Sequence, residues 1–336
     1  MDPSTQAAII GAGAAILTTL VKDISLPYLK HRKSKSDEIK SLTERYSYPL
    51  ANSALSLFYR LREMIVDQRH DYLKQINRTN TFNEYKFNSS VYRLASLIGW
   101  IRALKLEQSS ILLNHSTRDS TLSHLVAKFE SSLADGPHVE VAIIRGLSSL
   151  WAIDLPSEPG ELASIARKCD QARNLIFGNT LRDSSKAKLK ESIRDVANAL
   201  CSCTRSQFLS NEILFETIER AKNILSPKQA LIYRDWQSAI GDTVIYEAKD
   251  SIRKFDVIGY AEFESKIESK NKWINIVIEL FNDVDLNCIQ NDYRVKQLYE
   301  ILRASSSIII KINNLDIDSK PFTVQNINDA KRVIEN

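Results

Sequence analysis

Arg118 and His124 are the pair of side chains in this sequence whose types and spacing best suit acid–base chemistry. They begin and end the seven-residue stretch RDSTLSH. A histidine can move a proton to or from a ribose 2′-hydroxyl, and an arginine can stabilise the negative charge that develops at the phosphate. This stretch is therefore a candidate site for RNA cleavage.

An Arg, a polar neighbour and a His after four to six residues resemble the active-site motif of the HEPN ribonucleases, small helical toxins and defence effectors. The resemblance implies that Arg118 and His124 act together on RNA, with two copies of the motif facing the backbone in a dimer. About one Arg–His match of this spacing is expected by chance in a chain of this composition. The simpler interpretation, which we favour, places Arg118 in the first turn of a helix and His124 on its surface.

Asp242, Glu247 and Lys249 superficially resemble the Asp…Glu-x-Lys motif of metal-dependent nucleases. That motif requires Glu and Lys to point the same way from a strand. Here apolar residues recur every four positions over 227–255, which predicts a helix and places Glu247 and Lys249 about 200° apart around its axis. We interpret the three residues as part of an exposed helix face.

The remaining chemistry-bearing residues give no further site. Cys169, Cys201, Cys203 and Cys288 are too few for a disulfide framework, and the lone C-x-C lacks the second ligand pair of a zinc site. The sequence contains no P-loop, G-x-S-x-G or H-E-x-x-H motif. It therefore predicts no cofactor, no metal site and buried free thiols.

The N-terminal segment has the composition of a membrane-binding helix. Residues 7–21 read AAIIGAGAAILTTLV, without a charge, and the apolar character continues to Leu29. As a helix, 7–21 would be about 22 Å long, shorter than the roughly 30 Å hydrocarbon core, so the segment could span the membrane, lie on it or pack into the protein core. We expect membrane binding through Ile9, Ile10, Ile16, Leu17, Leu20, Lys30, Arg32 and Lys33.

A basic cluster at 30–35 follows this segment, and no Lys or Arg lies before the apolar run at 7–21. This asymmetry places the body of the protein on the cytoplasmic side of the membrane. Elsewhere, basic and acidic residues alternate and the formal net charge is only +4, a pattern typical of solvated helix faces rather than a nucleic-acid groove. We therefore expect the membrane and a protein as partners, with a homo-oligomer as a further option, and not nucleic acid.

The rest of the chain predicts an all-α fold. With 9 Gly and 8 Pro in 336 residues, turn-forming residues are too scarce for the many tight turns of an all-β protein. Apolar periodicity predicts helices at 36–66, with a kink or break at Pro49, and at 84–107, 121–133, 161–177, 184–200, 211–224, 227–255, 260–282 and 293–312. Residues 139–153 fit a strand or a helix equally well.

A Pro- and Gly-containing break at 155–160 suggests how the helices divide. We expect a membrane segment at 1–29, a helical subdomain at 30–135, a linker at 136–160 and a second helical subdomain at 161–336.

Three stretches, 92–104, 233–245 and 258–267, resemble a group of uncharacterised bacterial helical proteins with a short N-terminal apolar segment. The resemblance implies a helical, membrane-associated protein and no particular activity. It does not extend over about 134–227, which is an insertion or a divergent region. The matching residues are Arg234, Gln237, Ala239, Ile240 and Gly241, followed by Gly259, Tyr260, Ala261 and Phe263.

Together these features predict a membrane-tethered helical scaffold or interaction protein on the cytoplasmic face. One alternative is a ribonuclease that uses Arg118 and His124. The other is a membrane-acting effector whose N-terminal segment oligomerises through Gly11, Gly13 and Ala15.

Overall fold

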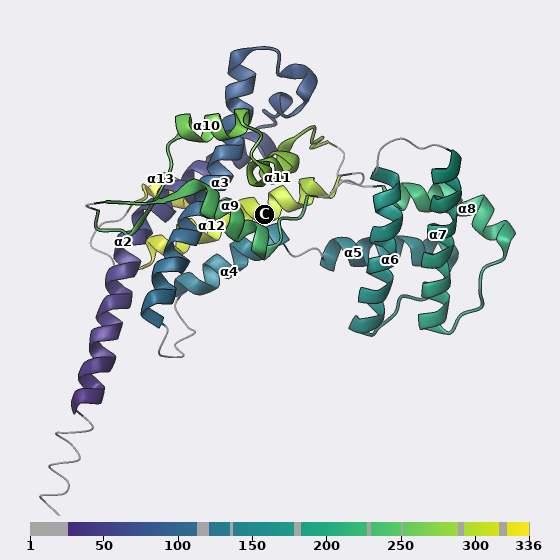
Figure 1. Ribbon diagram of the computed structural model, residues 1–336, viewed down its shortest axis with the longest axis horizontal. Coiled ribbons are helices and arrows are strands. Elements are labelled where there is room, and N and C mark those ends of the chain that lie inside the picture. Colours follow the sequence, from purple (N-terminus) through teal and green to yellow (C-terminus); the bar gives the residue numbers. More distant parts are fainter. Residues whose placement is uncertain are drawn as a thin grey trace, which may run out of the picture.

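The computed structural model describes residues 26–112, 121–134, 137–177, 183–226, 230–249, 251–287, 292–315 and 321–335. Within these ranges the chain forms twelve α-helices, two short 3₁₀ helices and one two-stranded sheet (Figure 1). The prediction of an all-α fold is therefore confirmed at the level of fold class. The helices are α2 (Leu26–Ile65), η2 (Asp71–Leu73), η3 (Gln75–Asn77), α3 (Thr81–Leu112), α4 (Thr121–Ala134), α5 (Pro137–Trp151), α6 (Pro159–Phe177), α7 (Asp183–Thr204), α8 (Asn211–Leu225), α9 (Arg234–Val244), α10 (Tyr260–Glu268), α11 (Lys272–Phe281), α12 (Tyr293–Asn313) and α13 (Val324–Glu335).

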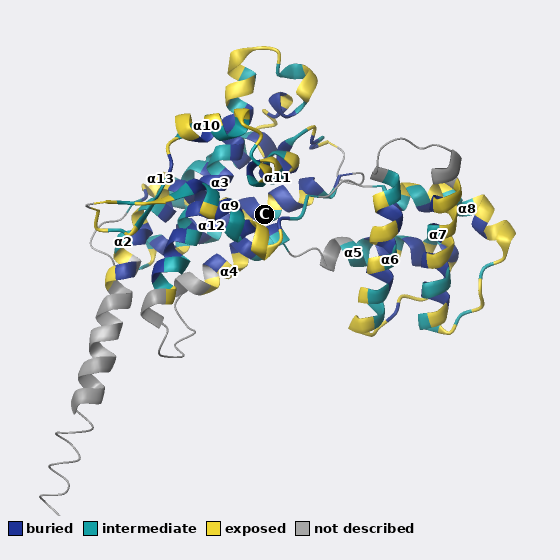
Figure 2. Ribbon diagram, viewed as in Figure 1, coloured by how far each residue is buried: buried dark blue, intermediate teal, exposed yellow. Residues whose placement is uncertain are grey.

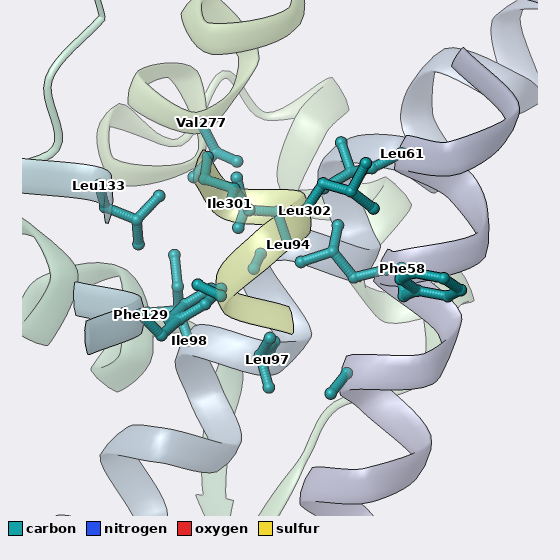
Figure 3. Packing of buried hydrophobic residues seen from close by; sticks show 14 of the residues in the cluster. Phe58, Leu61, Leu94, Leu97, Ile98, Phe129, Leu133, Val277, Ile301 and Leu302 are labelled. Carbon is teal, nitrogen blue, oxygen red and sulfur yellow. The ribbon is translucent and has the colours of Figure 1, made fainter. Parts of the chain in front are cut away.

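Helices from the two ends of the chain share one apolar core, which we call the main domain. α2, α3 and α4 pack with α9 to α13, and α12 lies against both α2 and α4. Figure 3 shows Leu61 of α2, Leu94 of α3 and Phe129 of α4 gathered around Leu302 of α12. α12 can occupy this central place because its apolar residues recur three or four positions apart on one face. They are Val295, Leu298, Ile301, Leu302, Ile308, Ile309 and Ile312, all buried.

α5 to α8 form a second body, the inserted bundle, with its own apolar core. It stands beside the main domain in Figure 1, and in Figure 2 its buried residues form a separate interior. The chain leaves the main domain after α4 and returns at Ile232, whose backbone N–H donates to the carbonyl of Leu133 at 2.9 Å. The two ends of the insertion are therefore adjacent.

These two cores divide the chain differently from the expected boundary at 136–160. α9 to α13 pack on α2 to α4 rather than on α6 to α8, so the expected second subdomain, 161–336, is shared between both bodies. The Pro- and Gly-containing break at 155–160 is only the turn between α5 and α6. A local break marks the end of a helix but does not say which helices bury their apolar faces together.

One ambiguous segment is now settled, and one predicted helix is too long. Of residues 139–153, left open between strand and helix, all but the last two belong to α5, which ends at Trp151. The helix predicted at 227–255 begins only at Arg234 and ends at Val244. It is followed by β1 (Ile245–Glu247) and β2 (Phe255–Val257), paired antiparallel. β-Branched and aromatic residues suit such a hairpin.

Two other predictions of helix boundaries are wrong. The break predicted at Pro49 is absent, since α2 continues through this residue, and the part of α2 from Leu42 onward packs against α3 and α12. The helix predicted at 260–282 is two helices, separated where Lys270 adopts a left-handed φ of 52°. The side chain of Asn271 then caps α11 by accepting from the backbone N–H groups of Trp273 and Ile274.

Candidate functional site

The structure tests the proposed RNA-cleaving pair only in part. His124 lies exposed in the first turn of α4. Arg118 falls in 113–120, outside the described residues, so whether the two side chains meet remains a prediction.

The proposed membrane-binding residues also lie largely outside the described part of the chain. Ile9, Ile10, Ile16, Leu17 and Leu20 belong to 1–25, which the structure does not describe. Lys30, Arg32 and Lys33 lie within α2, where only the helical backbone is described. Among the described helices, none has both the length and the apolar character needed to cross a bilayer.

The described thiols are poor candidates for chemistry. Burial raises the pKa of Cys169 to about 12 and also raises the pKa of Cys201 and Cys203. A raised pKa keeps each thiol protonated and therefore weakly nucleophilic. No group of three or more His, Cys, Asp or Glu side chains in the described residues could hold a metal ion.

The Asp242…Glu247–Lys249 interpretation needs correction in its geometry. Glu247 lies in β1 and Lys249 follows it, so these residues do not form the helix face inferred from apolar spacing. Asp242 lies on α9, and its two carboxylate oxygens accept from Nε and Nη2 of Arg102 at 2.7 and 3.2 Å. The carboxylate is therefore engaged in a bidentate ion pair between α9 and α3.

The three stretches that carry the resemblance to the bacterial group, 92–104, 233–245 and 258–267, lie side by side. α3 packs against α9, α10 and the hairpin. The hydroxyl of Tyr92 donates to the carbonyl of Ile258 at 3.0 Å, and the Tyr92 ring lies 5.5 Å from that of Tyr260 and 5.2 Å from that of Phe263. The residues that carry the resemblance thus build one seam of the main domain.

Two glycines allow the helices of this seam to approach closely. A Cβ on Gly241 of α9 would lie 2.5 Å from Cβ of Arg102 on α3, and a Cβ on Gly99 of α3 would lie 2.7 Å from Cγ2 of Val244. Both distances are below any normal carbon–carbon contact. The glycines are therefore required for packing, which is sufficient reason for their presence.

Glu130 of α4 is the centre of a polar network beside this seam. Its carboxylate pairs with Lys105 of α3 at 2.5 and 2.6 Å and with Arg234 of α9 at 3.3 Å. Arg234 also donates to the hydroxyl of Ser131 at 3.0 Å. One buried carboxylate thus joins three helices, and its charge is compensated by two cations.

Two glutamines hold the place where the inserted bundle joins the main domain. Nε2 of Gln237 donates to the carbonyls of Glu130 at 2.9 Å and Ile232 at 2.7 Å. Nε2 of Gln297 donates to the carbonyl of Leu133 at 3.0 Å. The carbonyl of Leu133 is one of the last four of α4, which have no partner within the helix itself, and the bond from Gln297 satisfies it.

A small pocket opens beside Gln237, with a volume of about 260 Å³ including the part open to solvent. Oε1 of Gln237 is buried and accepts no hydrogen bond from any described group. This oxygen can accept a hydrogen bond from a water or another small donor. Ser238 is the single hydroxyl of the lining, and the one carboxylate there, Glu130, is paired with Lys105 and Arg234, which makes it a weak base. The lining residues are Ile98, Ile101, Arg102, Lys105, Phe129, Glu130, Gln237 and Ser238.

The fold and this site define a helical protein whose polar groups join helices and fix the position of an inserted bundle. Comparison with protein-family models, curated proteins and solved structures finds no match to the chain. The resemblance to the bacterial helical group therefore stays a prediction.

Sequence reasoning missed Glu130, Lys105 and Gln297. A signal for the first two was present, because each is a charged residue next to apolar core positions of a helix, where a charge requires a partner. No comparable signal identified Gln297, because its role depends on where the chain returns from the insertion.

Proposed function

We propose that this chain is a membrane-associated interaction protein whose inserted bundle binds a protein partner. In this proposal residues 7–29 and the basic cluster at 30–35 attach the protein to the membrane, with the body on the cytoplasmic side. The composition of these segments supports the membrane role.

The adjacency of the two ends of the insertion is the observation that supports this proposal most. The hydrogen bond between Ile232 and Leu133 places the departing and returning chain side by side, and α5 to α8 bury their own core. An insertion of this kind can be gained without disturbing the host domain. A role separate from that of the main domain is therefore reasonable for the inserted bundle.

The inserted bundle also exposes large aromatic side chains. Phe208, in the loop before α8, is 61% exposed, and Phe215 of α8 is 71% exposed. Nζ of Lys190 on α7 lies 5.4 Å from the centre of the Phe215 ring. Exposed aromatic rings beside cations are typical anchors of protein interfaces.

Excision of the bundle tests this division of roles. A variant in which a short Gly-Ser linker replaces 137–226 should keep the helical content and cooperative unfolding of the main domain. It should also stay in the membrane fraction and lose the proteins that crosslink to the full chain in cells. Retention of the same crosslinked proteins would contradict the proposal.

A finer variant addresses the aromatic anchors. The double substitution Phe208→Ser and Phe215→Ser should weaken crosslinking to the partner at least tenfold, as loss of hot-spot residues does. Val324→Ser, at a 77% exposed position on α13 of the main domain, is the matched control and should leave crosslinking unchanged. If both variants weaken crosslinking equally, the partner-binding surface is not on the inserted bundle.

The membrane role has its own test. Full-length protein should stay in the pellet after washes with high salt and then carbonate, and a form starting at Lys30 should not. If both forms are soluble, the N-terminal segment does not anchor the protein, although the role of the inserted bundle could still hold.

RNA cleavage by Arg118 and His124 is a second candidate function. The observation in its favour is the exposure of His124 in the first turn of α4, where the side chain is accessible to a large substrate. Purified protein should then cleave RNA, and His124→Ala should abolish cleavage while the circular dichroism spectrum is unchanged. Equal cleavage by this variant would exclude the role.

A further inference from the structure

Two cationic side chains pair with one carboxylate where α2 packs on α3, and a third cation lies beside them. Glu63 of α2 accepts from Nη1 of Arg60 at 3.1 Å and is also paired with Nζ of Lys86 on α3. Arg93 of α3 donates from Nη1 to the carbonyl of Ser56, one turn before Arg60 on α2, at 2.9 Å. Burial, and secondly the charge of Arg60, lower the pKa of Arg93. Among the described residues these four groups give a net charge of +2.

This charge is largely removed from water. The Arg60 side chain is 5% exposed and that of Lys86 is mostly buried. Arg93 is half-buried and donates to the backbone carbonyl of Ser56 at 2.9 Å, and no described acidic side chain forms an ion pair with it. A desolvated cation without an anionic partner is unfavourable, so the cluster is suited to receive a negative charge.

Two buried donor groups in the cluster also lack an acceptor. Nε of Arg60 and the hydroxyl of Tyr72 make no hydrogen bond to any described group. The Tyr72 ring lies 5.8 Å from Cζ of Arg60 and 5.0 Å from Nζ of Lys86, so Tyr72 belongs to the same cluster. An oxyanion would provide the acceptors that both donors lack, because its oxygens accept several hydrogen bonds at once.

Exposed aromatic rings lie beside these cations. Phe82 of α3 is 64% exposed, and its ring centre lies 5.6 Å from Nζ of Lys86. Tyr85, on the next turn of the same helix, is also exposed, and its ring centre lies 5.9 Å from that of Tyr260 on α10. Flat exposed rings next to buried cations are suited to an aromatic group that is attached to a phosphate.

We propose that Arg60, Lys86 and Arg93 form a binding site for the phosphate group of a small soluble ligand. Phe82 and Tyr85 provide a stacking surface for an aromatic group on that ligand, as in a nucleoside monophosphate. The site lies near the end of α2, 34 residues after Leu26. At 1.5 Å per residue this is about 50 Å along the helix, which favours a soluble phosphate over a lipid headgroup near the membrane-binding segment.

Titration of the full chain with inorganic phosphate and with AMP tests the site. At constant ionic strength, both should raise the melting temperature in a saturable manner, and chloride should not. AMP should bind at least tenfold more tightly than phosphate if the aromatic rings contribute. Equal affinities would overturn the stacking part, and the absence of a saturable shift with both probes would overturn the site.

Matched variants connect binding to the cluster. Arg93→Gln and Lys86→Gln should each weaken AMP binding at least tenfold, whereas Arg62→Gln, which removes a cation paired with Asp329 elsewhere on α2, should not. Two site variants are used so that the test still gives an answer if one of them does not fold. Unchanged binding by both site variants would overturn the proposal, and tighter binding to vesicles containing a phosphoinositide than to AMP would replace the soluble ligand by a lipid. None of these outcomes depends on the proposed role of the inserted bundle.

Discussion

Arg294 and Arg60 are both arginines of the main domain and are almost equally buried, with side chains 4% and 5% exposed. Nε and Nη2 of Arg294 donate to the Asp292 carboxylate at 2.8 and 2.7 Å. Its Nη1 donates to the carbonyls of Glu279 and Asn282, both at 2.7 Å. Arg60 shares Glu63 with Lys86, and its Nη2 reaches the hydroxyl of Ser89 only at 3.5 Å.

The difference shows that burial alone does not define the role of a charged residue. Arg294 has a carboxylate of its own and acceptors for its other donors, so its charge is compensated within the protein. Arg60 is buried beside other cations, and its Nε has no described acceptor. In the first arrangement each buried charge depends on its partner, so that removing one partner leaves the other uncompensated. The second leaves both charge and hydrogen-bonding capacity for a ligand.

Replacing Arg294 should have the largest effect on stability. Arg294→Met would leave Asp292 buried without its cation and would remove the donor that the carbonyls of Glu279 and Asn282 share. The expected loss is about 3–5 kcal/mol in the free energy of unfolding. Urea denaturation followed by circular dichroism measures this loss, and a value below about 1 kcal/mol would show that the pair is not needed.

The sequence predicts the helices better than it predicts their partners. Apolar periodicity located α4, α6 to α8 and α12, because each of these helices shows apolar residues three to four positions apart. α3 was located by its long run of apolar residues, which are buried on most sides of the helix. It extended a helix through the hairpin because Ala248 and Ile252 happen to continue the four-residue spacing of α9. The spacing of apolar residues along the chain contains no information about hydrogen bonds between distant residues. One of these, from the N–H of Ile258 to the carbonyl of Val244, favours the hairpin over a continued helix.

The candidate sites were less accessible to sequence reasoning than the helices. Gln237 was identified only through a resemblance, and its role in holding the insertion depends on the carbonyls of Glu130 and Ile232. The cations Arg60 and Arg93 lie 33 positions apart and meet only because α2 packs on α3. Charges that approach one another through tertiary packing leave no spacing pattern in the chain.

A smaller loss is expected at the second arginine. Arg60→Met removes a hydrogen-bonded ion pair with Glu63 but also removes the repulsion between Arg60 and Arg93. Because Lys86 still compensates Glu63, the expected loss is about 1–2 kcal/mol without ligand. The same urea series measures it. A loss as large as that of Arg294→Met would mean that the two arginines have the same structural role.

The smallest effect on stability is expected at Arg93. Arg93→Gln removes a desolvated cation that has no described carboxylate, and the lost hydrogen bond to the Ser56 carbonyl is offset by the loss of repulsion from Arg60. Stability without ligand should therefore change by less than about 0.5 kcal/mol.

A double-mutant cycle separates these two contributions. If Arg60 and Arg93 repel each other, Arg93→Gln should be more favourable in the wild-type background than in Arg60→Met, by about 0.5–1 kcal/mol. The corresponding cycle of Arg294→Met with Asp292→Asn should give a coupling of the opposite sign, because those side chains attract. The same sign in both cycles would mean that the cations in the α2–α3 seam are already compensated. The uncompensated positive charge that supports a phosphate site would then be absent. Opposite signs would show that Arg60 and Arg93 repel each other and that a bound anion can relieve this repulsion.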